Sequence, residues 1–212
     1  AASFFSLYLL HYARERGIAP RITIYSRRNF DDLGPVGCKG CAGILSSTLI
    51  RNLAELRLAL PDEIIQSPIE RFAVHSPYAT IDITNPEATK IGSIYRGGGP
   101  RISSYADKIS FDGWLLKQAQ SRGAVVENRT VSRISLASPR PFIEADGTKI
   151  PYDLVVLATG VNVKQVLVDG VGYAPPGARI MAMNELHAGA AQVRACLGNV
   201  AHAFLIPNSG MI

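Results

Sequence analysis

The sequence contains one pair of closely spaced thiols, in the motif Cys38-Lys39-Gly40-Cys41. Cysteines at this spacing can form a redox-active dithiol, supply half of a zinc site, or lie in a glycine-rich loop that passes close to a planar ring. A zinc site needs further ligands, but no second C-x-x-C motif and no H-x(3–5)-H motif follows, because the four histidines are isolated in the sequence. Three cysteines in 212 residues also do not form a disulfide framework, so we expect reduced thiols.

Two glycine-containing segments could approach a ligand closely. Gly97-Gly98-Gly99-Pro100 lacks the Gly-Lys-Ser/Thr ending of a phosphate-binding P-loop, and we interpret it as a turn between two lobes. Ala158-Thr159-Gly160 follows a predicted strand, Tyr152–Leu157. Ligands of open α/β sheets bind at the carboxyl ends of strands, and glycine permits close backbone approach there. The second segment is therefore a candidate binding site.

The elements that would position these residues alternate along the chain. An apolar helix is predicted from about Phe4 to Arg16, and it should be covered on all sides. Small residues, Ala2 and Ser3, stand at its start, where free backbone amides can bind a phosphate. Further helices are predicted from Ser46 or Ser47 to Leu60 and from Ser110 to Gly123. Strands are predicted at 21–25, 64–75, 79–84, 90–95, 124–127, 131–136, 142–145, 152–157 and near 203–207, with a hairpin turn at Asp146-Gly147.

This order predicts an α/β fold: a Rossmann-like parallel sheet that carries an antiparallel β-meander, followed by the start of a β-rich lobe. The first helix has no strand before it in the sequence, although a parallel sheet requires one there. We therefore interpret the chain as a fragment that lacks its first strand and its C-terminal part.

Composition narrows the function classes. The chain has 22 Lys and Arg against 17 Asp and Glu, 47% hydrophobic residues and 18% charged residues, which predicts a folded protein with a substantial core. The arginines are spread along the sequence without a nucleic-acid motif, so we expect no nucleic-acid partner. A net charge of +5 instead favours a small anionic ligand such as a diphosphate. No apolar run reaches membrane-spanning length and no signal peptide is evident, so a cytoplasmic location is expected.

Four segments, in this order, resemble the flavin-dependent geranylgeranyl reductase group of the hydroxybenzoate-hydroxylase-like flavoproteins. They are Ala1–Ser3, Gly34–Ser46, Lys108–Leu116 and Thr148–Gly160. The first looks like the end of a G-x-G-x-x-[GA] turn, and the second like the cysteine loop beside the flavin ring. The third is similar to the R-x-x-F-D-x-x-L helix start, with Lys108 in place of Arg. The fourth is similar to the ATG segment.

The resemblance implies a set of site residues. Cys41 matches the family cysteine and is the candidate catalytic residue, acting through packing and polarity beside the flavin. The implied cofactor-binding residues are Ala2, Ser3, Ser26, Arg27, Ala42, Gly43, Lys108, Val131, Ala158, Thr159 and Gly160. One departure is clear, because the family places an acid at the end of the second strand and this chain has Ser26 and Arg27 there. Ser26 can bind a ribose hydroxyl and Arg27 a phosphate or the adenine face.

The resemblance implies FAD as cofactor and NADPH or another electron donor. It implies hydride transfer from reduced FAD to a carbon–carbon double bond of a prenyl lipid, and it allows a peripheral membrane association of the intact protein. The same FAD lobe also serves aromatic monooxygenases, which is one alternative. A non-catalytic thiol or metal-binding module that uses Cys38 and Cys41 is another. The sequence does not specify an oligomeric state.

We expect two interleaved lobes. Residues 1–60 and 101–165 would form the FAD-binding lobe, and residues 61–100 and 166–212 would begin the substrate-side lobe. If this interpretation is right, Ala2, Cys41 and Gly160 line one crevice.

Overall fold

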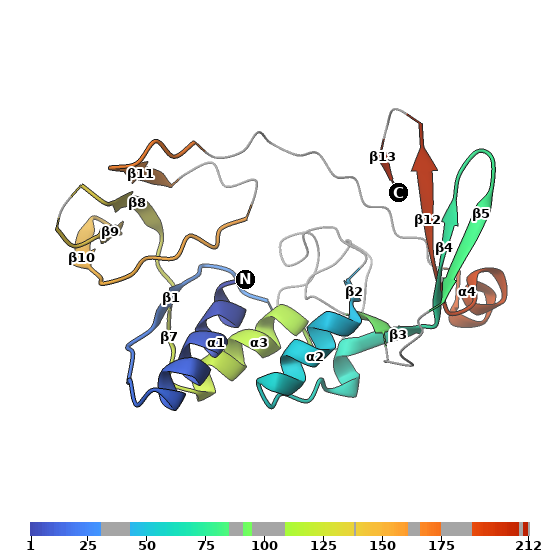
Figure 1. Cartoon of the computed structure of the whole chain (residues 1–212), viewed down its shortest axis with the longest axis horizontal. Coiled ribbons are helices and arrows are strands. Elements are labelled where there is room, and N and C mark those ends of the chain that lie inside the picture. Colours follow the sequence, from blue (N-terminus) through green and yellow to red (C-terminus); the bar gives the residue numbers. More distant parts are fainter. Residues whose placement is uncertain are drawn as a thin grey trace. The chain divides into compact units, whose positions relative to one another are not determined.

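The computed structural model describes residues 1–30, 43–84, 91–94, 109–137, 139–160, 166–174, 188–207 and 210–211. The chain divides into two compact units (Figure 1). Unit 1 consists of Ala1–Asn29 and Asp112–Ala182, and unit 2 of Phe30–Phe111 and Met183–Ile212. Helices occur with both parallel and antiparallel strand pairs, so the predicted α/β fold class is confirmed. The lobe boundaries expected near residues 60, 100 and 165 stay a prediction.

Unit 1 begins with helix α1 (Ala2–Glu15), which leads to strand β1 (Thr23–Tyr25). The helix ends because Gly17 adopts a left-handed conformation (φ +65°) and the Ile18 amide donates to the Ala13 carbonyl at 2.8 Å. Only one stripe of α1 is buried, including Ser6, Leu7 and Ala13, whereas Phe5 and Tyr12 are exposed. The expectation that α1 is covered on all sides is therefore wrong. The aromatic side chains of Phe5 and Tyr12 lie at the surface instead.

Strand β1 pairs in parallel with β7 (Val125–Glu127), with Tyr25 opposite Glu127. Helix α3 (Phe111–Ser121) precedes β7 and buries Trp114, Leu115 and Ala119. It ends as predicted at Gly123, which has φ +107°, and the Ala124 amide returns to the Ala119 carbonyl at 3.0 Å. Each of these two parallel strands thus follows a helix.

The rest of the described part of unit 1 is a four-stranded sheet in the order β10-β9-β8-β11. Strands β8 (Val131–Ser135), β9 (Phe142–Ala145) and β10 (Thr148–Pro151) form the predicted antiparallel meander. Asp146 and Gly147 connect β9 to β10 with φ values of +47° and +77°, as a tight two-residue hairpin requires. Strand β11 (Leu167–Asp169), which was not predicted, adds in parallel to β8. Ile134, Ile143 and Ala145 form the buried core of this sheet.

The predicted strand Tyr152–Leu157 is wrong, because these residues form no strand. Strand β8 already pairs with β9 on one side and with β11 on the other, so it offers this segment no free edge. The segment is anchored at its start, where the Tyr152 amide donates to the Pro141 carbonyl at 2.8 Å. Leu154, Val156 and Leu157 are exposed beyond that anchor.

In unit 2, helix α2 (Ser47–Glu55) has the predicted cap, because the Ser46 hydroxyl accepts the Leu49 amide at 3.3 Å. The helix ends five residues before the expected Leu60, since Arg57 adopts a left-handed conformation (φ +55°). The Leu58 amide then bonds the Leu53 carbonyl at 2.8 Å. This termination normally uses glycine, so the sequence carried no signal for it.

Unit 2 contains two sheets. The first has the order β2-β6-β3 and is antiparallel, formed by β2 (Ile44–Leu45), β6 (Ile91–Ile94) and β3 (Ile65–Ile69) after the short 3-10 helix Asp62–Ile64. The second has the order β13-β12-β4-β5. It contains β4 (Arg71–His75), β5 (Thr80–Thr84), β12 (Val200–Ile206) and β13 (Gly210–Met211). The run predicted as one strand at 64–75 is thus divided at Glu70 between the two sheets.

The second sheet joins distant parts of the sequence. Strand β12 pairs in parallel with β4, and β5 pairs antiparallel with β4 on the other side. Helix α4 (Ala190–Leu197), which was not predicted, leads into β12 (Figure 1). None of the helices in the described ranges is long and apolar enough to cross a membrane.

Candidate functional site

The carboxyl end of β1 carries the hydroxyl and guanidinium groups that follow it in sequence. The Ser26 amide donates to the Glu127 carbonyl at 3.0 Å, which extends the parallel pairing of β1 with β7. The Ser26 hydroxyl accepts the Arg28 amide at 3.3 Å. The Arg27 Nη1 donates to the Thr130 hydroxyl at 3.1 Å. Ser26 and Arg27 are thereby held beside the segment that enters β8, whose first residue is Val131.

Arg129, in the segment between β7 and β8, stabilises this segment through contacts with two other elements. Its guanidinium lies 3.7 Å from a carboxylate oxygen of Glu127 and 3.1 Å from one of Asp146, and it donates to the Ala145 carbonyl. A planar guanidinium with several donors can hold three acceptors at once. Arg129 therefore connects β7 to the β9–β10 hairpin, whereas Arg27 contacts Thr130 and is exposed.

A pair of tyrosines links β1 to the segment that leads to the ATG residues. The hydroxyls of Tyr25 and Tyr152 lie 2.8 Å apart, and their rings meet edge to face with centroids separated by 6.5 Å. Burial, and then the hydrogen bond to Tyr152, raises the pKa of Tyr25 well above the ordinary value for a phenol. The Tyr25 hydroxyl therefore stays protonated over the physiological pH range.

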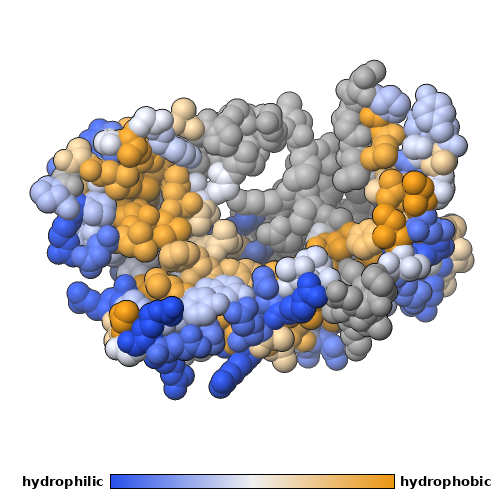
Figure 2. Space-filling model, in the orientation of Figure 1, coloured by the Kyte–Doolittle hydropathy of each residue, from blue (hydrophilic) through white to orange (hydrophobic). Residues whose placement is uncertain are grey.

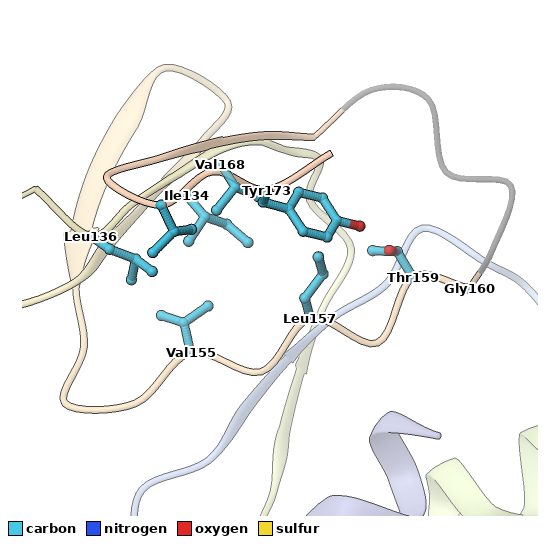
Figure 3. A pocket seen from close by; sticks show the side chains of 9 residues that line it. Ile134, Leu136, Val155, Leu157, Thr159, Gly160, Val168 and Tyr173 are labelled. Atoms are coloured by element: carbon cyan, nitrogen blue, oxygen red, sulfur yellow. The ribbon is translucent and has the colours of Figure 1, made fainter. Parts of the chain in front are cut away.

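Thr159 and Gly160 border an apolar pocket of about 540 Å³ in unit 1 (Figure 3). Its other walls come from β8 and β11, from the residues that follow each of these strands, and from the extended segment before Thr159: Ile134, Leu136, Val155, Leu157, Val168, Val171 and Tyr173. Figure 3 shows the Tyr173 ring directed toward Thr159, so two hydroxyl groups lie at one end of an otherwise apolar cavity. The volume is within the range of small-molecule sites. The hydrophobic surface of unit 1 in Figure 2 lies over this region.

Ala2 and Ser3 lie in the first turn of α1. The residue before the helix, Ala1, makes no side-chain cap hydrogen bond, and the first turn contains no acidic residue. Figure 1 shows α1 and β1 running in opposite directions within unit 1. The start of the helix and the carboxyl end of β1 therefore face the same side of the unit, where ligands of such sheets bind.

Gly43 lies in unit 2, immediately before β2, with φ +65°. A Cβ at this position would lie 2.5 Å from the Ile94 carbonyl oxygen, so only glycine fits against β6. This contact accounts for the glycine without a ligand. The predicted residues Cys38, Cys41, Ala42 and Lys108 lie outside the described residues, as does Gly97–Pro100. The crevice expected between Ala2, Cys41 and Gly160 therefore stays a prediction.

The structure brings together two groups of the predicted residues, both in unit 1. Ser26 and Arg27 lie at the end of β1, where Arg27 contacts Thr130, the residue before Val131, while Thr159 and Gly160 border the pocket, with Ala158 directly before them. Sequence reasoning missed the other pocket walls: Ile134, Leu136, Val155, Leu157, Val168, Val171 and Tyr173. A strand was predicted at 131–136, but nothing in the sequence indicated that β11 would pair with it.

No family model matches the chain. The chain is 29% identical over 129 residues to Protein FixC of Salmonella typhi, a match that covers 56% of this chain and 28% of that protein. Among solved structures, a geranylgeranyl bacteriochlorophyll reductase-like protein from Thermoplasma acidophilum aligns over 70% of this chain and 33% of its own, with 16% identity and a TM-score of 0.46. The halogenase PltM aligns over 82% of this chain and 33% of its own, with 12% identity and a TM-score of 0.47. The chain thus spans about a third or less of the length of these proteins.

Proposed function

We propose that unit 1 binds FAD and that the protein is a flavin-dependent oxidoreductase that reduces carbon–carbon double bonds of a prenyl lipid. The observation that carries this proposal is the location of Thr159 and Gly160 at an apolar pocket, in the same unit as a strand end that presents Ser26 and Arg27. The four segments that resemble the geranylgeranyl reductase group supply the cofactor and the reaction class.

The donor groups of unit 1 fit a dinucleotide that carries a diphosphate and a ribose. The first turn of α1 has small side chains and no acid, so nothing negative opposes a phosphate there. Ser26 accepts a backbone amide through its oxygen and keeps its own proton for a ribose hydroxyl. Arg27 uses Nη1 for Thr130, and a guanidinium has further N–H groups for a phosphate. A serine and an arginine thereby serve where the family uses an acid.

When bound, reduced FAD would supply a hydride to the double bond, with a proton added at the neighbouring carbon and NADPH or another donor restoring the reduced state. The residues of this chain bind and orient the reactants and exclude water. Apart from Thr159 and Tyr173, every residue at the pocket is apolar or glycine, which suits a hydrocarbon chain better than a polar aromatic acid. This pocket favours the lipid substrate over the alternative, FAD-dependent aromatic hydroxylation.

The first test is the visible spectrum of the intact protein purified from cells. Absorbance bands near ~370 and ~450 nm would support a flavoprotein. A colourless protein that contains zinc would favour a thiol or metal-binding module built on Cys38 and Cys41. After reduction of the flavin, faster reoxidation by a prenyl lipid than by an aromatic substrate with oxygen would support the proposed reaction, and the reverse order would overturn it.

Cofactor binding to this chain can be tested separately with variants. We expect Arg27→Met to weaken FAD binding about tenfold, the loss of one charge-assisted hydrogen bond. Arg21→Met removes an exposed arginine before β1, near the opposite end of the strand from Arg27, and is the matched control. Quenching of FAD fluorescence measures both affinities. Equal affinity of the two variants would contradict the assignment of Arg27.

A further inference from the structure

Two histidines of unit 2 come together on one face of the sheet β13-β12-β4-β5. In the parallel pairing of β4 with β12, His75 is opposite Phe204 and His202 is opposite Ala73. Because side chains alternate along a strand, all four residues share a face. Ala73 is small, so the two imidazoles can approach each other diagonally. The two histidines are 127 positions apart in sequence, and only the fold makes them neighbours.

The two rings meet edge to edge. The His75 Nε2 lies 2.9 Å from the His202 Nδ1, and the ring planes are only 13° apart with centroids separated by 5.2 Å. The Phe204 ring stacks on His75 at 4.5 Å between centroids and 17° between planes. The aromatic contact and the sheet therefore hold two nitrogen atoms facing one another.

The outer nitrogens of the pair are also engaged. The His202 Nε2 lies 3.4 Å from the Leu197 carbonyl, which can only accept, so this nitrogen carries the proton and Nδ1 presents its lone pair. The His75 Nδ1 lies 2.9 Å from the Thr80 hydroxyl. The 2.9 Å contact between the rings is a hydrogen bond, so in the metal-free chain the His75 Nε2 carries the proton that the His202 Nδ1 accepts. A metal ion would replace that proton, and the His75 Nδ1 would then donate to the Thr80 hydroxyl. Outer hydrogen bonds of this kind typically orient histidines that bind a metal.

The surroundings favour a cation. Leu197 is the last residue of α4, and the carbonyls at the end of a helix carry partial negative charge. Two ligands that each lie ~2.0–2.1 Å from a metal ion subtend an angle of about 90° when they are 2.9 Å apart, so this spacing suits one ion. Because the ring centroids are 5.2 Å apart, the two nitrogens face each other head-on, and the rings must turn for both lone pairs to meet at the ion. His75 also borders a pocket of about 480 Å³.

We propose that His75 Nε2 and His202 Nδ1 form a binding site for one divalent transition-metal ion, of the group Cu²⁺, Ni²⁺ and Zn²⁺ that imidazole prefers. The described residues contain no cluster of three or more His, Cys, Asp or Glu side chains, so water completes the coordination here. The bound ion connects β4 to β12 across the sheet. Binding is weaker than at structural zinc sites, which use four protein ligands.

The test uses the 212-residue chain with its thiols alkylated, so that cysteines cannot bind the probe. Calorimetric titration with Ni²⁺ should give one ion per chain. We expect His75→Gln and His202→Gln each to weaken binding by about tenfold or more. His11→Gln, in α1 of unit 1, is the control and should leave the affinity unchanged. Retention of wild-type affinity in both glutamine variants at the pair would overturn the proposal, as would a dissociation constant above ~1 mM, an affinity too weak for two fixed ligands.

Two further measurements do not depend on the folding of those variants. In the unaltered chain, Ni²⁺ should protect His75 and His202 from modification by diethylpyrocarbonate, which peptide mapping would measure. If the two histidines are modified at the same rate with and without the ion, the site is excluded. Thr80→Val removes the outer partner of His75 and should weaken Ni²⁺ binding several-fold, because the ring is less firmly oriented. Thr84→Val, on the same exposed strand, should leave Ni²⁺ binding unchanged. Equal effects of the two variants would contradict the assigned role of Thr80.

Discussion

The tyrosine pair shows how one contact can be tested through its pH dependence. We expect Tyr152→Phe to destabilise the chain by about 1 kcal/mol near neutral pH, because the Tyr25 hydroxyl loses its partner. Tyr25 also has a raised pKa in the folded state, so the unfolded chain releases this proton first. Its contribution to stability is therefore complete below pH ~10 and declines as the pH rises above that value.

The variant should lose less stability than the wild type between pH 8 and pH 10.5, because the pKa of Tyr25 moves back toward its ordinary value. Urea unfolding at the two pH values measures the difference. Tyr78→Phe is the control, since Tyr78 is almost fully exposed. An identical alkaline decline in wild type and Tyr152→Phe would show that the hydrogen bond has no effect on the pKa.

Substitutions at two glycines of unit 1 can distinguish the energetic cost of backbone strain from that of a steric clash. Gly170 and Gly147 have similar φ values, +88° and +77°, but a Cβ at Gly170 would lie 2.7 Å from the Ala137 amide nitrogen, whereas Gly147 has open space. Gly147→Ala should destabilise by about 1–2 kcal/mol from the left-handed conformation alone. Gly170→Ala should cost clearly more, because backbone must shift beside Leu136, a wall of the pocket. Urea unfolding compares the two variants, and equal losses of stability would contradict the steric contact at Gly170.

At the scale of elements, α2 offers a stabilising substitution. Arg57 ends this helix with φ +55°, a conformation that glycine adopts without cost. Arg57→Gly should therefore stabilise the chain by about 1 kcal/mol. Arg51→Gly, inside the same helix, should destabilise it by a similar amount. Thermal unfolding followed by circular dichroism measures both, and a loss of stability in Arg57→Gly would show that the arginine side chain is needed there.

Most elements with a local signal could be predicted from the sequence. The cap at Ser46, the glycine end of α3 and the Asp146-Gly147 turn each depend on residues within five positions of one another. The end of α2 could not be predicted, because Arg57 carries no preference for a left-handed conformation. The segment Tyr152–Leu157 has the composition of a strand, but strand formation needs a neighbour, and β8 pairs with β9 and β11 instead.

The same distinction applies to the candidate site. Ser26, Arg27 and Thr159 stay predictions as site residues, although the end of β1 and a glycine-containing segment mark them in sequence. The contact of Arg27 with Thr130 spans 103 positions and depends on the register of β1 with β7. The pocket walls at Leu136 and Val168 depend on the pairing of β8 with β11, and the histidine pair on that of β4 with β12. Such pairings are properties of the fold rather than of any short motif.

At the scale of the whole molecule, the division into two units predicts that each responds to its own ligand. The single tryptophan, Trp114, is buried in α3 and belongs to unit 1, so its fluorescence reports on that unit, while far-ultraviolet circular dichroism reports on both. A ligand that binds only the folded state stabilises the unit that holds it. We expect FAD to raise the midpoint of the fluorescence transition, which reports on unit 1. Ni²⁺, added after the thiols are alkylated, should raise the midpoint of only that part of the circular dichroism transition that comes from unit 2. His202→Gln should abolish the Ni²⁺ effect and leave the FAD effect unchanged, because His202 lies in unit 2. If the two signals instead coincide and shift together with either ligand, the chain unfolds as one cooperative unit and the two sites are coupled through it.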